Sequence, residues 1–219
     1  MNARKLLAVA MLAALVVGCQ RPSPQVLREG DILFQDLQCG PLCEAINAVT
    51  QGVDGRNFSH CGMVVRVADT LCVVEATGDC VQLASVRHFF ARTGDTAQVR
   101  NVAVGRLRAE HQHLVPAATA YALRQLGIPY DDLFLPDNGK LYCSELIYEA
   151  FRAADSIAPL FGLRPMTYKR PNADEFFPAW ADYYAALGAC IPEGELGINP
   201  GLISTSEALV MVDYPQFVQ

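Results

Sequence analysis

Short apolar segments, rich in Val and bounded by turn residues, dominate the first half of the chain. Segments 58–67, 71–77, 81–83 and 98–107 have the composition of β-strands, and Asp-Thr and Gly-Asp pairs separate some of them. Segment 30–35 starts with a turn and continues as a further strand. The short spacings between these segments predict antiparallel neighbours in one sheet.

Other segments have the 3.6-residue periodicity of amphipathic helices. Several are bounded by residues that start or stop helices, with Pro, Ser or a capping box at the beginning and Gly past the end. Polar loops over 52–57 and 131–140 interrupt the pattern. The predicted helices run from residue 41 to just before Gly52, and over 85–90, 114–126, 143–151 and 172–187.

The segment after the last predicted helix, residues 191–206, contains three glycines and two prolines. We expect it to be extended and to lie across the surface. The chain has no internal repeat and no low-complexity tract. A single α+β domain of antiparallel sheet and helices therefore accounts for residues 30–219.

The first eighteen residues predict a secretory leader. Arg4 and Lys5 give a positively charged start, and residues 6–17 form an apolar run of twelve. Such a run is shorter than the roughly 20 residues that span a bilayer. It ends in Leu-Val-Val-Gly-Cys19, which resembles the lipobox of bacterial lipoproteins, where the cysteine becomes the lipidated first residue. An ordinary leader and an uncleaved anchor are the alternatives.

This leader predicts the organisation and location of the protein. Residues 1–18 are expected to be a lipoprotein signal peptide, and residues 19–29, with two prolines, a spacer from lipidated Cys19 to the domain. Gln20, rather than Asp, follows the cysteine, which by analogy with Gram-negative sorting favours the outer membrane. We expect a lipid anchor on its periplasmic face.

The composition is that of a globular protein, with 52% apolar and 18% charged residues. The formal net charge is −6. Nucleic acid is therefore not an expected partner, because binding it requires a basic surface.

Eight cysteines are many for 219 residues, and export would allow disulfides to persist. With Cys19 lipidated, seven remain, so at least one thiol stays unpaired. Cys39 and Cys43 have the spacing of a local bridge or of half a zinc site, but no second ligand pair follows. We expect no metal and no cofactor. The sequence leaves open the pairing among Cys39, Cys43, Cys61, Cys72, Cys80 and Cys190.

Cys143 is the strongest candidate for chemistry because the predicted helix 143–151 begins at this residue. Unpaired N–H groups and the helix dipole stabilise a thiolate there, although a cysteine in an apolar segment can also be core filler. His60 lies at the mouth of a predicted strand and can take the thiol proton and return it to a leaving group. The other histidines have polar or charged neighbours that indicate surface positions: His88, His111 and His113.

A third group should orient the imidazole by accepting a hydrogen bond from its other nitrogen. Glu75 lies within an apolar strand, where an acid needs a partner. In a hairpin that pairs Val67 with Thr70, Glu75 and His60 lie diagonally on one face. A register shifted by one residue would place them on opposite faces. The reserve candidates are Asp79 and Gln82.

Together, segments 30–34, 58–65, 74–76 and 142–146 resemble the YiiX/YaeF-like cysteine hydrolases. These form part of the circularly permuted branch of the NlpC-type, papain-like superfamily. The order His60, Glu75, Cys143 is the one that the permuted branch requires. The resemblance also covers Pro129-Tyr130-Asp131 and residues 192–195, and so spans nearly all of residues 30–206.

The resemblance implies a permuted papain-like fold, in which a barrel-like antiparallel sheet packs against helices. It implies Cys143 as nucleophile, His60 as general base and then acid, and Glu75 as the orienting residue. The N–H of Cys143 is a natural oxyanion donor. Cys61 is expected to serve packing or a disulfide. Candidates for substrate contacts, or else for core positions with satisfied polar groups, are Tyr142, Tyr130 and Asp131.

Three functions are consistent with this sequence. The first is a thiol hydrolase that cleaves an amide through an acyl-enzyme, on cell-wall peptide or an amino-acid conjugate. The second is an acyltransferase or a lipid or thioester hydrolase, resembling lecithin-retinol acyltransferase-like proteins. The third is a lipoprotein that binds without catalysis. A long apolar groove beside Cys143 would favour lipid, whereas a short cleft with charged groups would favour peptide.

Overall fold

The computed structural model describes residues 26–37, 39–93 and 102–212. The expected signal peptide, Cys19 and the first residues of the predicted strand 98–107 lie outside the described residues. No helix in the part of the chain that is described has the length and apolar character needed to cross a membrane.

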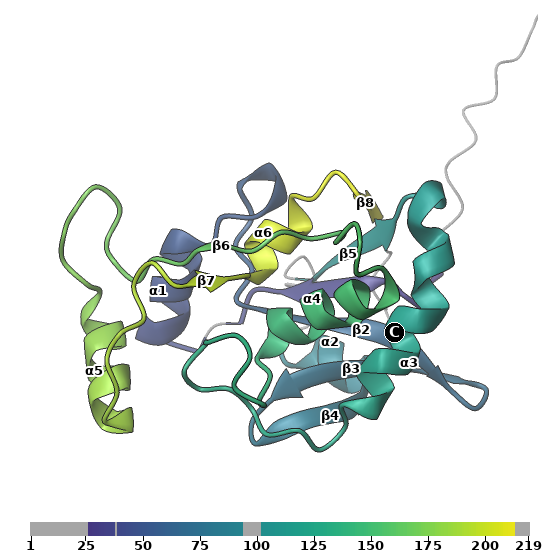
Figure 1. Ribbon diagram of the computed structural model, residues 1–219, viewed down its shortest axis with the longest axis horizontal. Coiled ribbons are helices and arrows are strands. Elements are labelled where there is room, and N and C mark those ends of the chain that lie inside the picture. The colour runs from purple at the N-terminus through teal and green to yellow at the C-terminus, as the bar shows by residue number, and fades with distance from the viewer. Residues whose placement is uncertain (1–25, 38, 94–101, 213–219) are drawn as a thin grey trace, which may run out of the picture.

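A six-stranded antiparallel sheet forms the centre of the molecule (Figure 1). Its strand order, β4-β3-β2-β1-β5-β8, is linear, with β4 and β8 at the two edges. Two further strands, β6 (Arg164–Pro165) and β7 (Leu196–Gly197), pair with each other outside this sheet. The strands of the main sheet are β1 (Ile32–Gln35), β2 (His60–Val67), β3 (Thr70–Thr77), β4 (Cys80–Ser85), β5 (Val102–Leu107) and β8 (Leu209–Val212).

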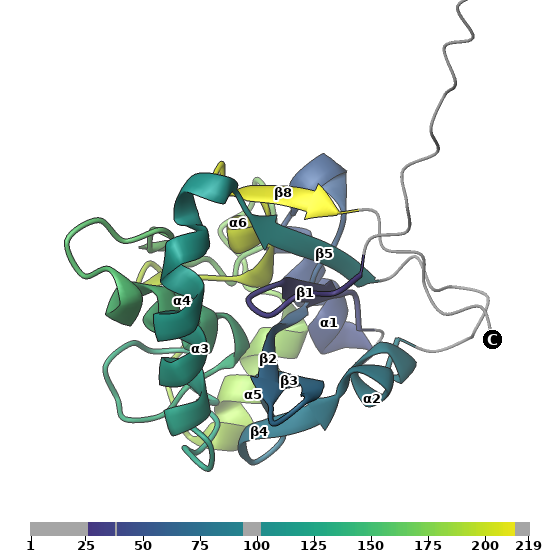
Figure 2. The ribbon, with the colours of Figure 1, turned by 90° about the vertical axis from the view of Figure 1, so that its right-hand side faces the viewer.

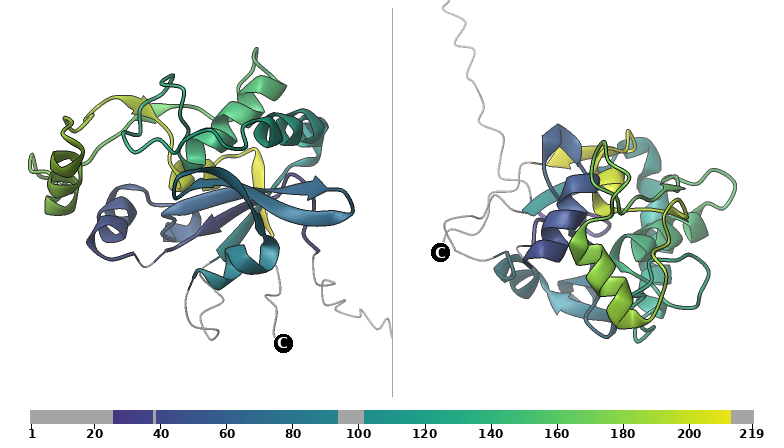
Figure 3. Two further views of the ribbon diagram at one scale, coloured as in Figure 1. Left: turned by 90° about the horizontal axis from the view of Figure 1, so that it is seen from below. Right: turned by 90° about the vertical axis from the view of Figure 1, so that its left-hand side faces the viewer.

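Helices cover both faces of the sheet (Figures 2 and 3). The long helices α3 (Val115–Arg124) and α4 (Cys143–Ala154) lie on one face, and α2 (Val86–Ala91) lies on the other. At one end of the molecule, α1 (Pro41–Val49) packs against α5 (Pro178–Leu187). The remaining helical segments are η1 (Val53–Gly55), η3 (Ala109–Leu114) and α6 (Pro200–Ser204).

The alternation of side chains along β2 divides the core into two layers. Cys61, Met63 and Val65 are fully buried in the layer beneath α3 and α4. Val64 points the other way and packs in the layer that contains Phe89 of α2. This period-two pattern explains why β2 is almost continuously apolar: both of its faces are covered.

The structure confirms the first four predicted helices and most of the strands. Ser85 caps α2, since its side chain accepts a hydrogen bond from the backbone N–H of His88. Gly127 follows α3 with a φ of 85°, the left-handed conformation that glycine adopts without strain. Strand β8, which the sequence did not predict, pairs with β5 at the edge of the sheet.

Two predictions about the C-terminal region are wrong. The helix predicted over 172–187 begins only at Pro178. Residues 170–175 form a turn instead, in which the backbone carbonyl of Arg170 accepts the N–H of Ala173 and the backbone N–H of Arg170 donates to the carbonyl of Glu175. The tail is not extended throughout, because Asn199 caps α6 by accepting a hydrogen bond from Leu202. Asn199 supplies the cap, and Pro200 takes the first helical position, where proline is favoured.

Candidate active site

The N-terminus of α4 carries Cys143, the first residue of the helix and only 6% exposed. Tyr142 is the N-cap, and its backbone N–H donates to the Glu145 carboxylate at 3.3 Å, which holds the first turn. Leu146 and its apolar neighbours on the same helix face fix α4 against the sheet. The thiol therefore lies at the positive end of the helix dipole, where a thiolate is stabilised.

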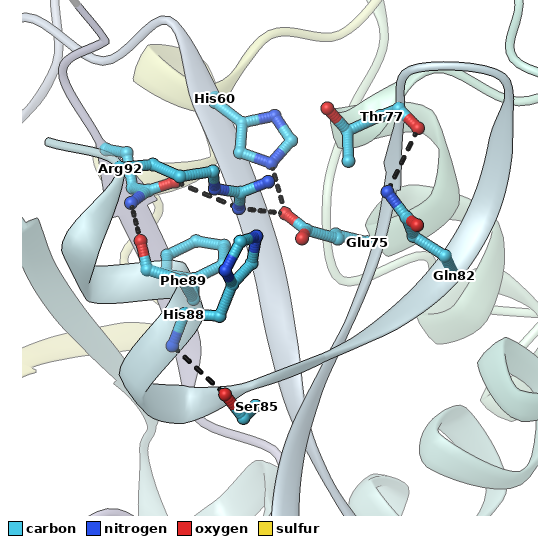
Figure 4. Close-up of polar contacts among 9 residues, drawn as sticks. His60, Glu75, Thr77, Gln82, Ser85, His88, Phe89 and Arg92 are labelled. Carbon is cyan, nitrogen blue, oxygen red and sulfur yellow. Dashed lines mark hydrogen bonds and ion pairs between the residues drawn. The ribbon is translucent and has the colours of Figure 1, made fainter.

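His60, the first residue of β2, forms a buried hydrogen bond with Glu75 of β3. Its Nε2 lies 2.6 Å from Oε2 of Glu75, and the two side chains are 6% and 0% exposed. The strands pair Val67 with Thr70, as the sequence predicts, and this register brings both side chains to one face. In Figure 4, one ring nitrogen of His60 is directed at the carboxylate.

Hydrogen bonds also connect Cys143 to its neighbours and shift the pKa values of the site. A hydrogen bond with Cys61 does most to hold the pKa of Cys143 well below its ordinary value; burial opposes this, and a hydrogen bond with His60 adds to it. Burial by itself lowers the pKa of His60, but hydrogen bonds with Cys143 and Glu75 raise it to about 9. The lowered pKa of Cys143 and the raised pKa of His60 favour a thiolate and an imidazolium at neutral pH, the reactive state of a nucleophilic cysteine.

Cys61 does more than fill the core. It alternates to the opposite face of β2 from His60, and α4 covers that face, so its buried free thiol meets Cys143. Burial raises the pKa of Cys61 well above its ordinary value, and the contact with Cys143 adds to this effect. Cys61 is therefore a neutral thiol that donates a hydrogen bond to Cys143, rather than the half of a disulfide that was one expectation.

Arg92, which follows α2, is a partner of Glu75 that the sequence analysis did not identify. Its Nη2 donates to the same Oε2 that faces His60 (Figure 4). Burial raises the pKa of Glu75, but the hydrogen bonds from His60 and Arg92 outweigh burial and lower the pKa. The available signal was the buried acid itself, because a buried carboxylate needs a compensating cation.

The reserve candidates for the orienting group make other contacts. The Gln82 side chain donates to the backbone carbonyl of Thr77 at the exposed edge of the sheet. Asp79 lies in the turn between β3 and β4, where its carbonyl accepts the N–H of Tyr130. Glu75 is therefore the acid that meets the imidazole of His60.

A cavity of about 360 Å³ opens beside Cys143 and His60. Most of its lining is apolar or aromatic, and Asp132 is the one acidic residue among the described lining residues. Cys39 and Cys43, which form a disulfide, contribute to the wall at the start of α1, so the local bridge is the alternative that the structure confirms. The apolar and aromatic lining includes Leu37, Leu42, Ile46, Val49, Phe134, Met166, Trp180, Tyr183, Ile198 and Pro200.

The three candidates for substrate contacts have different positions. Tyr130 and Tyr142 both line the cavity, and the Tyr142 hydroxyl also accepts the backbone N–H of Ile198 at 3.1 Å. Asp131 does not line it: its carboxylate is fully buried and accepts the N–H groups of Leu133 and Leu135. These two hydrogen bonds shape the loop after Tyr130, so Asp131 has a structural role and is not proposed as a substrate contact.

The residues that the structure describes contain no group of three or more His, Cys, Asp or Glu that could hold a metal ion. Among solved structures, the chain is similar to one described as the metalloprotein yiiX from Escherichia coli O157:H7, with 24% identity and a TM-score of 0.67. The match covers 86% of this chain and 98% of that one. It supports the fold and carries no metal to this chain.

No curated protein matches the chain. A family model described as a permuted papain-like amidase enzyme, YaeF/YiiX, matches residues 26–213, which include the candidate catalytic residues Cys143, His60 and Glu75. The match covers nearly all of the described domain. The chain therefore belongs to the YaeF/YiiX family of permuted papain-like amidases, C92.

Proposed function

We propose that this protein is a cysteine amidase in which Cys143, His60 and Glu75 act as nucleophile, acid-base and orienting residue. The observation that carries the proposal is the convergence of the three buried side chains, with His60 hydrogen-bonded to Glu75 and lining the same cavity as Cys143. Membership of an amidase family supports the hydrolytic reaction. The lowered pKa of Cys143 supports the sulfur as nucleophile.

The first half of the reaction transfers the acyl group to sulfur. The thiolate of Cys143 attacks the amide carbonyl carbon, and the oxygen that becomes negative accepts the N–H of Cys143, which has no acceptor within the helix. The imidazolium of His60 gives its proton to the nitrogen of the leaving amine. The C–N bond breaks, the amine departs, and the acyl group remains as a thioester on Cys143.

The second half restores the enzyme. Neutral His60 accepts a proton from a water molecule, whose oxygen attacks the thioester carbon. The C–S bond breaks, which releases the carboxylic acid and leaves a thiolate on Cys143 beside an imidazolium. Glu75 holds the ring and stabilises its charge in both halves through the hydrogen bond at Nε2.

The substrate class proposed first is a cell-wall peptide or another amino-acid conjugate. The sequence supports it through the lipobox-like end of the leader at Cys19, which would tether the enzyme to the periplasmic face of the outer membrane. Mass spectrometry of the N-terminal peptide of the membrane-bound protein should find that it begins at Cys19 and carries the added mass of acyl chains. A peptide that retains residues 1–18, or that carries no acyl chain at Cys19, would contradict lipidation at this residue.

A second candidate is hydrolysis or transfer of a fatty acyl group from an ester or thioester. The lining of the cavity favours it, since apolar residues such as Leu42, Ile46 and Trp180 surround the space beside Cys143. An apolar chain would gain most from such a lining. The same three catalytic groups serve both candidates, because both reactions pass through an acyl-thioester.

One experiment tests the mechanism and the substrate class together. The protein is incubated with peptidoglycan fragments, and separately with phospholipids, and adducts are located by mass spectrometry of the Cys143 peptide. An acyl adduct that disappears in Cys143→Ala and persists in Cys190→Ala, a change at an exposed cysteine, supports the proposal. Turnover that Cys143→Ala retains in full would contradict it.

The same material tests for a lipoprotein that binds without catalysis. Iodoacetamide near neutral pH should modify Cys143 faster than Cys190, despite its burial, and His60→Ala should remove this preference. If Cys143 shows no preferential modification, the binding function is favoured and the amidase is rejected.

A further inference from the structure

The ion pair between Arg92 and Glu75 shares an atom with the hydrogen bond between Glu75 and His60. One carboxylate oxygen, Oε2, accepts from both Nη2 of Arg92 and Nε2 of His60. The Glu75 side chain is 0% exposed and the Arg92 side chain 23%. A cation of the protein therefore contacts the same oxygen atom that orients the proposed acid-base residue (Figure 4).

Besides Glu75, two side chains hold the guanidinium of Arg92 in this position. It lies over the ring of Phe89, with 5.0 Å between Cζ and the ring centroid. Its Nη2 also donates to Oε1 of Gln35 on β1 at 3.4 Å, and the side-chain amide of Gln35 donates to the carbonyl of Phe89. Arg92 is thus fixed against the α2 face of the sheet, and its contact with Glu75 does not rely on a mobile side chain alone.

We propose that Arg92 is a positioning residue, which keeps Glu75 ionised and fixes its carboxylate for the hydrogen bond with His60. A fully buried carboxylate beside a neutral imidazole would be costly, and the guanidinium compensates its charge. The inference rests on the proposed function of Cys143, His60 and Glu75. Arg92 is not among the described residues that line the cavity, so it acts through Glu75.

Removing the positive charge of Arg92 should raise the pKa values of the neighbouring groups. Every group nearby then binds a proton more readily, because a cation opposes protonation of its neighbours. The Glu75–His60 pair should take up its proton at higher pH, and the Cys143 thiolate should form at higher pH. If the ion pair only holds α2 against the sheet, its loss should lower stability and leave the pKa values of His60 and Cys143 unchanged.

The test uses Arg92→Gln, Arg92→Lys and a matched control, Arg87→Gln. Arg87 is exposed on the same helix, so its replacement removes the same charge without touching Glu75. The rate of iodoacetamide modification at the Cys143 peptide is measured by mass spectrometry across pH 4–10. In Arg92→Gln the midpoint should move up by about one pH unit, whereas Arg92→Lys and Arg87→Gln stay near wild type.

A second readout does not depend on the thiol. In a Cys143→Ala background, NMR of the imidazole follows the titration of His60 directly. Arg92→Gln should raise the apparent pKa of His60, and Arg92→Lys, which retains the charge, should restore it. Should Arg92→Gln fail to fold, Arg92→Lys still tests the inference: a shift of His60 in this charge-conserving variant would contradict a role set by charge.

The possible failures are distinguishable. If Arg92→Gln loses thermal stability but keeps wild-type midpoints for Cys143 and His60, the ion pair is structural and this inference is overturned. If wild-type Cys143 is no more reactive than Cys190, the proposed function fails instead. The His60 titration then still decides whether Arg92 controls the charge of the Glu75–His60 pair.

Discussion

The hydrogen bond at 2.6 Å between Nε2 of His60 and Oε2 of Glu75 leaves Nδ1 as the ring nitrogen available to Cys143. This division of the two nitrogens has a consequence for pH dependence. In the proposed reaction, the imidazolium of His60 donates a proton to the leaving amine, and the pKa of His60 is raised to about 9. Amide cleavage should therefore persist up to about pH 9 and fall above it.

Replacing Glu75 by Gln should lower the pKa of His60, because a neutral amide no longer stabilises the imidazolium. The alkaline fall in activity should then begin at lower pH, and NMR of the imidazole measures the change directly. Glu110→Gln, on the exposed segment η3, removes the same charge outside the site and serves as control. An unchanged His60 titration in Glu75→Gln would contradict the assigned hydrogen bond.

The same substitution should change how stability depends on pH. The folded-state pKa of Glu75 lies below its ordinary value of 4.5, so its contribution is present above pH 4.5 and is lost as the pH falls. Urea unfolding of the wild type should show this loss on acidification. In Glu75→Gln the free energy of unfolding should decline less steeply below pH 4.5, and an equally steep decline would contradict the ionised state of Glu75.

The hydrogen bond between Cys61 and Cys143 makes Cys61→Ala a direct test of thiolate stabilisation. Loss of this donor should raise the pKa of Cys143, and below the pKa each unit of increase reduces the thiolate population about tenfold. Modification of Cys143 by iodoacetamide near pH 6 should slow accordingly. Cys72→Ala, a half-buried cysteine on β3, is the matched control and should leave the rate unchanged.

The sequence predicts the positions of residues that are set by local pattern, but not the contacts that are set by packing between layers. The two-residue turn between Val67 and Thr70 fixes the register, so the common face of His60 and Glu75 follows from the sequence. The apolar face of α4 and its start near Cys143 follow from helical periodicity.

Arg92 and Cys61 show the limit of this reasoning. Arg92 meets Glu75 only because α2 folds back over the sheet, which no local pattern specifies. Cys61 faces away from His60 along the strand, and its role depends on which face α4 covers. The position of Asp131 was predicted as part of a loop, but its hydrogen bonds to the loop backbone became visible only in the structure.

Asp31 and Arg106 form a buried ion pair that joins the start of β1 to β5, and its loss should destabilise the fold. Nε of Arg106 lies 2.7 Å from Oδ1 of Asp31, with side chains 9% and 1% exposed. Asp31→Asn leaves the guanidinium buried without its counterion, which costs about 3 kcal/mol. Urea unfolding measures this loss, and Asp174→Asn, in an exposed pair with Lys169, should cause no measurable change.

Gly201 on α6 tests how the C-terminal tail shapes the cavity. A Cβ at this position would overlap the backbone carbonyl of Thr50, at the end of α1, and backbone cannot move aside as a flexible side chain can. Gly201→Ala should therefore push α6 away and cost about 2 kcal/mol of stability. Thr50 and Pro200 line the cavity, so the displacement should also slow acyl-adduct formation at Cys143.

The control for Gly201→Ala is Gly162→Ala, where an added Cβ meets nothing within 4 Å. Thermal unfolding and adduct formation are measured for both variants. If Gly201→Ala is as stable and as reactive as Gly162→Ala, then α6 does not lie tightly against Thr50. If stability falls but adduct formation at Cys143 does not, the tail supports the fold without defining the cavity, since a wall that sets the position of the substrate cannot shift without changing the rate.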